Sequence, residues 1–114
     1  MSFELTIDQV VDEAYKTSKE KGWHPTPDHT FPERIALMHS ELSEALEEFR
    51  NGHGVSEVYY GPDGKPEGVP IELADAIIRI ADCCGSHGVD LESALRIKLQ
   101  YNRTRPHRHG GKKL

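Results

Sequence analysis

The sequence predicts a small all-α domain built from four helices. Three observations lead to this fold class. Apolar residues recur at helical spacing in four separate stretches, which is typical of helices that bury one face. Joints rich in glycine and proline separate these stretches, and both residue types interrupt helices. The chain has 114 residues, the length of a single domain.

The first two helices are predicted at about residues 6–21 and 32–51. Gly22 provides a C-terminal stop for the first helix. The joint that follows contains two prolines within residues 23–31 and therefore cannot continue the helix. The second helix begins near Pro32, a favoured residue in a first turn. Its apolar stripe consists of Ile35, Met38, Leu42, Ala45, Leu46 and Phe49.

A long segment rich in glycine and proline, residues 52–69, joins the second helix to the third. Its sequence is compatible with a short hairpin or with an ordered loop. The third helix is predicted to open at Pro70 and to end near Gly85. The fourth is predicted to open at Asp90, which is a good N-cap residue.

The fourth helix is expected to stop at Pro106, because proline interrupts a helix. The helical domain is therefore predicted to span residues 1–106. The remaining residues, 107–114, form a basic tail that we expect to be mobile.

Composition excludes several classes of protein. The formal net charge of −5 argues against a polymeric nucleic acid as partner, since such binders usually carry a basic face. No apolar run approaches the roughly 18 residues that a membrane span requires, and the N-terminus lacks the pattern of a secretory signal. Cys83 and Cys84 are adjacent, which disfavours a disulfide between them, so we interpret them as reduced core thiols. A cytoplasmic location is expected.

The apolar content is low for a chain that folds alone. Hydrophobic residues make up 36% of the sequence, which supplies only a modest core for a domain of this length. We therefore expect either a small, wet core or a core that a second copy of the chain completes. The second alternative predicts a homo-oligomer.

The third predicted helix carries acids among apolar residues. Because it is apolar on nearly all sides, we expect it to be a buried helix. Its polar residues are Glu72, Asp75, Arg79 and Asp82, whose spacings of 3, 4 and 3 place them in one stripe. Buried carboxylates are costly unless positive charge pairs with them, and one arginine cannot neutralise three. A bound divalent cation would supply the missing charge.

The second helix offers a similar pair, Glu41 and Glu44, at the edge of its apolar stripe. Two helices with acids at i and i+3 can bring four carboxylates, those of Glu41, Glu44, Glu72 and Asp75, to one point. Oxygen ligands favour a hard cation, so the predicted cofactor is Mg²⁺, with Mn²⁺ as an alternative. The competing interpretation is that these acids are merely solvated or structural. A di-iron centre is disfavoured, because no histidine follows a glutamate by three residues.

Basic and aromatic residues suggest a substrate. Lys98, Asn102 and Arg105 are spaced by 4 and 3, so they share a face of the fourth helix and suit a polyphosphate. The alternative is an ordinary enrichment of basic residues near a helix C-terminus. Trp23 and His39 are candidates for contact with a nucleobase. Their alternative roles are to close the proline-rich joint onto the core and to lie as a polar neighbour of the site.

These motifs, taken together, resemble a known family. The order Glu41-Leu-Ser-Glu44, then 27 residues, then Glu72-Leu-Ala-Asp75 is similar to the E-x-x-E…E-x-x-D signature of the MazG-like all-alpha nucleoside triphosphate pyrophosphohydrolases. The later Lys98, Asn102 and Arg105 look like the K-x-x-x-N-x-x-R segment of the dCTP pyrophosphatase branch. The resemblance covers about residues 33–106. It implies a four-helix MazG-like bundle completed by oligomerisation, as a homodimer or homotetramer.

The resemblance also implies an activity. The four acids would bind Mg²⁺, and the enzyme would cleave a nucleoside triphosphate to the monophosphate and pyrophosphate as nucleotide-pool housekeeping. Lys98, Asn102 and Arg105 would contact phosphates or sugar.

The chain departs from the family pattern at Ser40, where many members carry an additional glutamate. The catalytic role would then fall to Glu41 or Glu44, which would polarise the water together with the metal. Two other functions stay open: a helical oligomer that binds nucleotide or metal without turnover, and a plain interaction module in which the acids are structural.

Overall fold

The structure, a computed structural model, describes residues 5–106 and is mostly helical. Its helices are α1 (Ile7–Glu20), α2 (Phe31–Arg50), α3 (Val69–His87) and α4 (Leu91–Thr104). The strands β1 (Tyr59–Tyr60) and β2 (Pro66–Glu67) pair antiparallel, with Tyr59 opposite Glu67. The segment between α2 and α3 thus forms the short hairpin, one of the two alternatives predicted. The predicted basic tail lies outside the described residues.

Local sequence signals set the beginnings of the helices. The Thr6 hydroxyl accepts a hydrogen bond from the backbone N–H three residues later, which caps α1. Thr30 and Glu33 form a capping box at the start of α2, and Asp90 caps α4. These side chains satisfy N–H groups that have no partner inside the helix. All four predicted helix starts are confirmed to within one residue.

The predicted end of the third helix was wrong by two residues. Helix α3 continues through Gly85 to His87, and Gly88 ends it in the left-handed conformation, with φ of 66°. Gly85 instead serves packing between helices, because a Cβ atom there would lie 2.6 Å from the Cβ of Tyr15 on α1. The sequence contains two glycines near this end, and only the tertiary contact distinguishes their roles.

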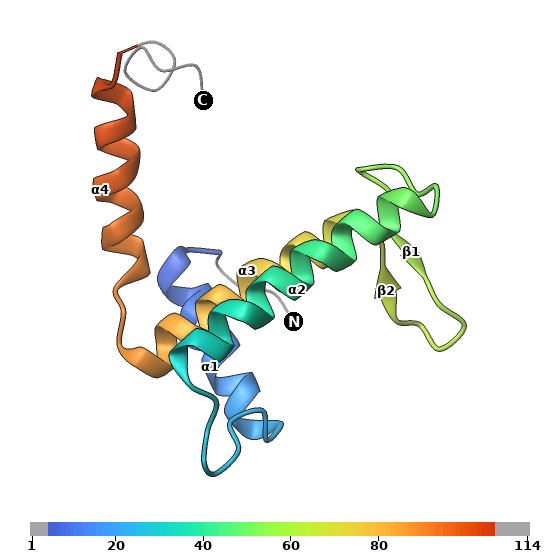
Figure 1. The fold of residues 1–114 in the computed structure, drawn as a ribbon, viewed down its shortest axis with the longest axis horizontal. Coiled ribbons are helices and arrows are strands. Elements are labelled where there is room, and N and C mark those ends of the chain that lie inside the picture. Colours follow the sequence, from blue (N-terminus) through green and yellow to red (C-terminus); the bar gives the residue numbers. More distant parts are fainter. Residues whose placement is uncertain (1–4, 107–114) are drawn as a thin grey trace.

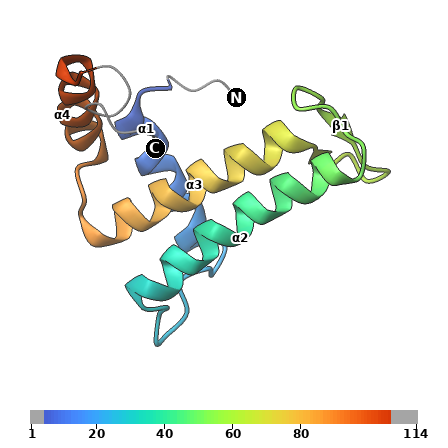
Figure 2. The same cartoon turned by 45° about the horizontal axis from the view of Figure 1, so that its top comes forward.

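Helix α3 is the centre of the fold. It packs against α2 along one side and against α1 on another, as Figures 1 and 2 both show. The buried apolar side chains are small, which lets the helix backbones approach closely. They are Ala14, Ala45, Val69, Ala76, Ala81, Cys83 and Cys84. Both cysteines are free, in agreement with their interpretation as reduced core thiols.

The expectation that this helix is buried on all sides was wrong for the single chain. Leu73, Ile77 and Ile80 are 44%, 57% and 37% exposed. Helices α1 and α2 cover only part of the circumference of α3. Helix α4 does not cover the rest, because the chain turns at residues 88–90 and α4 extends away from the α2–α3 pair (Figure 1).

Helix α4 contributes little to the core of its own chain. None of its side chains, all of which belong to the described part of the chain, is buried. Its recorded hydrogen bond to another helix runs from the backbone N–H of Asp8 to Glu92, at 3.3 Å. Its exposed apolar residues are Ile97, Leu99 and Tyr101.

A network of polar side chains lies where α1, α2 and α3 meet. The Ser18 hydroxyl donates to Asp82 at 2.7 Å, and His24 Nε2 lies 2.8 Å from the same carboxylate. Arg34, which is 6% exposed, approaches Asp82 at 3.9 Å and donates to Asp28. His24 Nδ1 lies 2.6 Å from Asp28 and closes the network. These contacts tie the joint at residues 21–30 to the three-helix core.

The network shifts the pKa values of its members. Burial lowers the pKa of His24, but hydrogen bonds to Asp82 and Asp28 outweigh burial, so the net shift is upward. The hydrogen bond with His24 lowers the pKa of Asp28 to about 2. Both shifts favour a charged His24–Asp28 pair.

None of the helices within residues 5–106 combines the length and the apolar content that crossing a lipid bilayer requires.

The buried network predicts the effect of removing its central carboxylate. Asp82→Asn should lower the free energy of unfolding by about 3 kcal/mol, because it leaves Arg34 and His24 without their buried counter-charge. Urea unfolding at pH 7 and fixed protein concentration measures this change. The matched control is Asp12→Asn, since Asp12 is exposed and forms a surface ion pair with Lys16. The control should change stability by less than about 0.5 kcal/mol. Equal effects of the two substitutions would contradict the role assigned to the network.

Candidate metal centre and its cavity

Three of the four predicted metal-binding carboxylates come together. Glu41 on α2 and Glu72 and Asp75 on α3 each offer an oxygen, and these oxygens lie within 4.8 Å of one another. Glu41 is buried, and Glu72 and Asp75 are half-buried. The i, i+3 spacing places Glu72 and Asp75 on the side of α3 that faces α2. The packing of α2 on α3 therefore assembles the cluster, as the sequence predicted.

The fourth carboxylate, Glu44, lies beside Glu72. It is exposed as a residue and does not belong to the three residues whose oxygens lie within 4.8 Å of one another. Burial, followed by a hydrogen bond to Glu44 and the charges of Glu44, Asp75 and Glu41, raises the pKa of Glu72 to about 7.

Asp75, the other α3 acid of the cluster, also has a raised pKa. Burial, followed by the charges of Glu41 and Glu44, raises the pKa of Asp75, while the charges of Arg79 and Lys65 oppose the rise. In addition, Glu72 Oε2 is buried and has no hydrogen-bond partner within residues 5–106. A buried acceptor without a donor costs free energy. The cluster is therefore destabilising as it stands and would gain from a positive ligand.

A divalent cation fits this donor set. The ligands are carboxylate oxygens alone, which hard cations such as Mg²⁺ prefer, and Mg²⁺ binds oxygens at about 2.0–2.1 Å. Oxygens bound to one such ion lie at most about 4.2 Å apart, so oxygens within 4.8 Å of one another would need only small side-chain movements to reach a common ion. The residues that would hold the ion are Glu41, Glu72 and Asp75, with Glu44 as a fourth ligand. Bound metal would lower the carboxyl pKa values and supply a partner for Glu72 Oε2.

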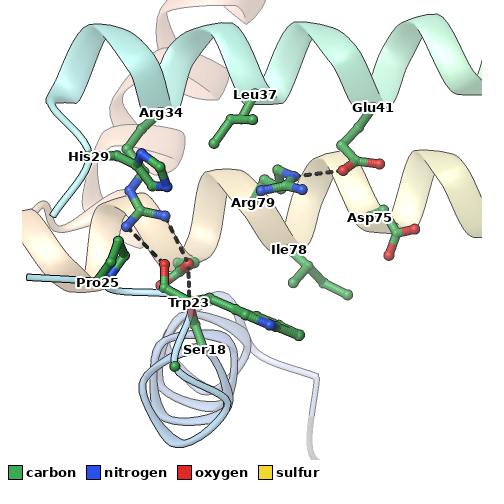
Figure 3. Close-up of a pocket in the computed structure, with 12 residues that line it drawn as sticks. Ser18, Trp23, Pro25, His29, Arg34, Leu37, Glu41, Asp75, Ile78 and Arg79 are labelled. Carbon is green, nitrogen blue, oxygen red and sulfur yellow. Dashed lines mark hydrogen bonds and ion pairs between the residues drawn. The ribbon is translucent and has the colours of Figure 1, made fainter.

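A cavity of about 520 Å³ adjoins the carboxylates (Figure 3). Glu41 and Asp75 line one part of its wall, and Asp82 with Arg34 line another. Its wall also carries the apolar side chains of Leu37 and Ile78 and the ring of Trp23. A space of this size, with charged groups beside apolar surface, is within the range of small-molecule sites.

Of the two residues predicted to contact a base, the structure brings one to the cavity. Trp23 lines it and is 58% exposed, so its ring is accessible for stacking. His39 is exposed on α2 and is not among the residues that line the cavity. At helical spacing, His39 lies about 200° around α2 from Glu41. That rotation accounts for its absence from the cavity of its own chain.

The predicted phosphate-binding residues lie elsewhere in the single chain. Lys98, Asn102 and Arg105 belong to α4 or follow it directly, and no residue of α4 is among those lining the cavity. Lys98 Nζ and the Arg105 guanidinium both lie over the ring of Tyr101, at 5.1 and 5.9 Å from its centroid. The three residues thus share a region of α4, as predicted, but one chain does not bring them to the acids.

The sequence predicts one stripe of polar residues on α3, whereas in the structure these residues belong to two separate groups. Glu72 and Asp75 join the carboxylate cluster, whereas Asp82 belongs to the buried network with Ser18 and His24. Arg79 lies between them and donates from Nε to Glu41 Oε1 at 2.6 Å (Figure 3). Its position four residues after Asp75 was a visible signal that it would face the same site.

The raised carboxyl pKa values predict how stability depends on pH. Glu72 has a higher pKa in the folded chain, about 7, than its ordinary value of 4.5. Between these values the folded chain binds more protons, so stability without metal should fall as pH rises from about 5 to 8. Glu72→Gln should remove part of this loss and raise the melting temperature in EDTA at pH 8. Differential scanning fluorimetry across pH measures both effects.

Adding Mg²⁺ in place of EDTA to the melting experiment gives a second test of the carboxylate cluster. It should raise the melting temperature of the unmodified chain at pH 8 and have a smaller effect on Glu72→Gln. Glu47→Gln is the matched control, because Glu47 is exposed on α2 and forms a surface ion pair with Arg50. It should behave like the unmodified chain. A melting temperature that neither EDTA nor Mg²⁺ changes would assign the acids a purely structural role.

Comparison with known proteins identifies no relative. No family model, no curated protein and no solved structure matches the chain. The functional interpretation therefore depends on the carboxylate cluster, the cavity and the sequence motifs themselves.

Proposed function

We propose that this protein is a Mg²⁺-dependent nucleoside triphosphate pyrophosphohydrolase that converts a (d)NTP to the (d)NMP and pyrophosphate. The observation that carries the proposal is the convergence of Glu41, Glu72 and Asp75 from two helices, with Glu44 beside them. Such a cluster would hold a cation that neutralises the charge developing on a phosphate. The order of these acids in the sequence, which resembles the signature of the MazG-like family, also supports the proposal.

The reaction is a hydrolysis of one phosphoanhydride bond. Water forms a new P–O bond at the α-phosphorus, and the bond between that phosphorus and the α–β bridging oxygen breaks. Pyrophosphate leaves with the bridging oxygen, and the proton of the water passes to a carboxylate and then to solvent. Glu41 and Glu44 are the proposed groups for orienting and deprotonating the water. Ser40 is not available for this role, because it lacks a carboxylate and its hydroxyl donates to the Leu37 carbonyl.

The cavity beside the acids supports a nucleotide as substrate. Trp23 offers an accessible aromatic face, and base stacking on such a face is tolerant of base identity. The carboxylate cluster borders the same cavity through Glu41 and Asp75. A nucleotide could thus place its base near Trp23 and its phosphates near the metal. The preferred base stays open.

We further propose that the active enzyme is a homo-oligomer with a MazG-like arrangement. Helix α4 leaves its apolar residues Ile97, Leu99 and Tyr101 exposed at 72%, 61% and 56%. Helix α3 leaves Ile77 exposed at 57%. Apolar surface on two elements favours association with a second copy. Helix α4 of one copy would then supply Lys98, Asn102 and Arg105 to the phosphates held by another.

Product analysis tests the activity. The protein is incubated with a panel of NTPs and dNTPs, including methylated and oxidised bases, with and without Mg²⁺. We expect monophosphate and pyrophosphate, separated by ion-exchange chromatography, only when metal is present. Asp75→Asn should lower kcat by about 100-fold or more, because it weakens a metal ligand. Asp12→Asn, on the exposed side of α1, is the matched control and should keep full activity.

Two other results would change the assignment. Diphosphate and orthophosphate would keep the metal site but move the cleaved bond to the terminal anhydride. Nucleotide binding without product from any triphosphate would favour the non-catalytic nucleotide-binding oligomer.

The assembly has its own test. Leu99→Asp should dissociate the oligomer and lower turnover, while the fold of the chain persists, because Leu99 is 61% exposed in the single chain. Gln100→Asp introduces the same residue on another face of α4 and should leave assembly intact. Analytical ultracentrifugation measures the oligomeric state, and circular dichroism measures whether the helical fold persists. A monomeric but fully active parent protein would contradict the proposed oligomer.

A further inference from the structure

Arg79 occupies the boundary between the carboxylate cluster and the rest of the cavity. It projects from α3 one turn after Asp75 and lines the 520 Å³ cavity together with Glu41 and Ile78 (Figure 3). Its side chain is 41% exposed, so solvent and solutes reach it. The sequence motifs assign it no role.

The hydrogen bonding of Arg79 leaves donors unused. Nε donates to Glu41 Oε1 at 2.6 Å, which fixes the plane and position of the guanidinium group. Within residues 5–106, the terminal nitrogens Nη1 and Nη2 have no hydrogen-bond or ion-pair partner. A guanidinium held in this way presents a planar pair of N–H groups to the cavity.

The other arginine of the cavity wall is already engaged. Arg34 is 6% exposed, and its guanidinium contacts Asp28, Asp82 and the Trp23 carbonyl. Its function is therefore to neutralise the buried network. Among the described arginines that line the cavity, Arg79 alone combines exposure with unused donors.

We infer that Arg79 binds a phosphate group of the substrate through Nη1 and Nη2 while its Nε–Glu41 bond keeps it beside the metal. The identity of the substrate rests on the proposed function. The chemistry favours a phosphate, since the arginine fork matches two phosphate oxygens and forms charge-assisted hydrogen bonds with them. A cation held by Glu41 would place those oxygens within reach of the same side chain. Arg79 would thus supply positive charge from the chain that also supplies the carboxylates.

A purely structural alternative predicts a different pattern. In both roles Arg79 lies beside Glu41, so its removal takes away a cation that opposes metal binding, and metal should bind at least as tightly as before. If Arg79 only neutralises Glu41, phosphate held by the metal should then bind as well as before. If Arg79 binds phosphate, the affinity for phosphate should fall. The two roles therefore differ in the change of phosphate affinity.

The experiment uses the full chain and two probes. Mn²⁺ alone, followed by its electron paramagnetic resonance signal, reports the carboxylate cluster. Inorganic tripolyphosphate with saturating Mg²⁺, followed by isothermal titration calorimetry, reports the phosphate subsite. Arg79→Gln should weaken tripolyphosphate binding by about 10- to 100-fold, as expected for the loss of charge-assisted hydrogen bonds. Its affinity for Mn²⁺ should be equal to or higher than that of the unmodified chain.

Two further variants keep the result interpretable. Arg79→Lys retains the charge beside Glu41 but lacks the fork, so it should fold normally and bind tripolyphosphate with intermediate affinity. It serves as the test if Arg79→Gln does not fold. Arg50→Gln removes an exposed arginine at the end of α2 that pairs with Glu47, and it should match the unmodified chain.

The inference is overturned if Arg79→Gln binds tripolyphosphate normally, if it loses affinity for Mn²⁺ and tripolyphosphate equally, or if the unmodified chain does not bind the Mg²⁺ complex of tripolyphosphate. Failure of the proposed function has a separate signature. A chain that binds tripolyphosphate through Arg79 yet releases no monophosphate from any nucleotide would retain the phosphate subsite and lose the assigned reaction.

Discussion

The close packing of α3 against α1 and α2 is the constraint on which the structure depends. The buried apolar side chains of the three helices are small, among them Ala76 and Ala81 on α3, Ala14 on α1 and Ala45 on α2, so the backbones can approach closely. This approach leaves the acids of the polar stripe buried or half-buried, while Asp75, Arg79 and Asp82 also border the cavity. Each charged group on that stripe must therefore find a partner inside the protein or in a ligand.

The two halves of the polar stripe meet this requirement differently. Asp82 has a hydroxyl, an imidazole and a guanidinium around it, so its charge is compensated within the chain. Glu72 has other carboxylates around it, together with a buried oxygen that no donor reaches. The same helix thus carries a satisfied acid, Asp82, nearly three turns away from an unsatisfied one, Glu72. Natural folds tolerate an unsatisfied buried acid mainly where a ligand or a reaction uses it.

Much of this arrangement was readable from the sequence, because it depends on local signals. The four helix starts follow from capping residues and prolines, and the convergence of Glu41, Glu72 and Asp75 follows from helical spacing on two neighbouring helices. The role of Gly85 was not readable, since it depends on where the Tyr15 ring packs. The partners of the Asp82 network were also missed, because they come from a loop whose path the sequence does not specify. The direction of α4 likewise depends on the turn at residues 88–90, which the helical pattern of the sequence does not specify.

The close approach of Tyr15 on α1 to Gly85 on α3 sets how near these two helices lie to each other. Since a Cβ at position 85 would meet the Tyr15 ring, any side chain there must push α1 away from α3. Helix α1 carries Ser18 and leads directly into Trp23, which both line the cavity. A side chain at position 85 would therefore shift α1, and with it Ser18 and Trp23, relative to α3. A substitution at this position could change the width of the cavity from outside it, while Glu41, Glu72 and Asp75 stay in place.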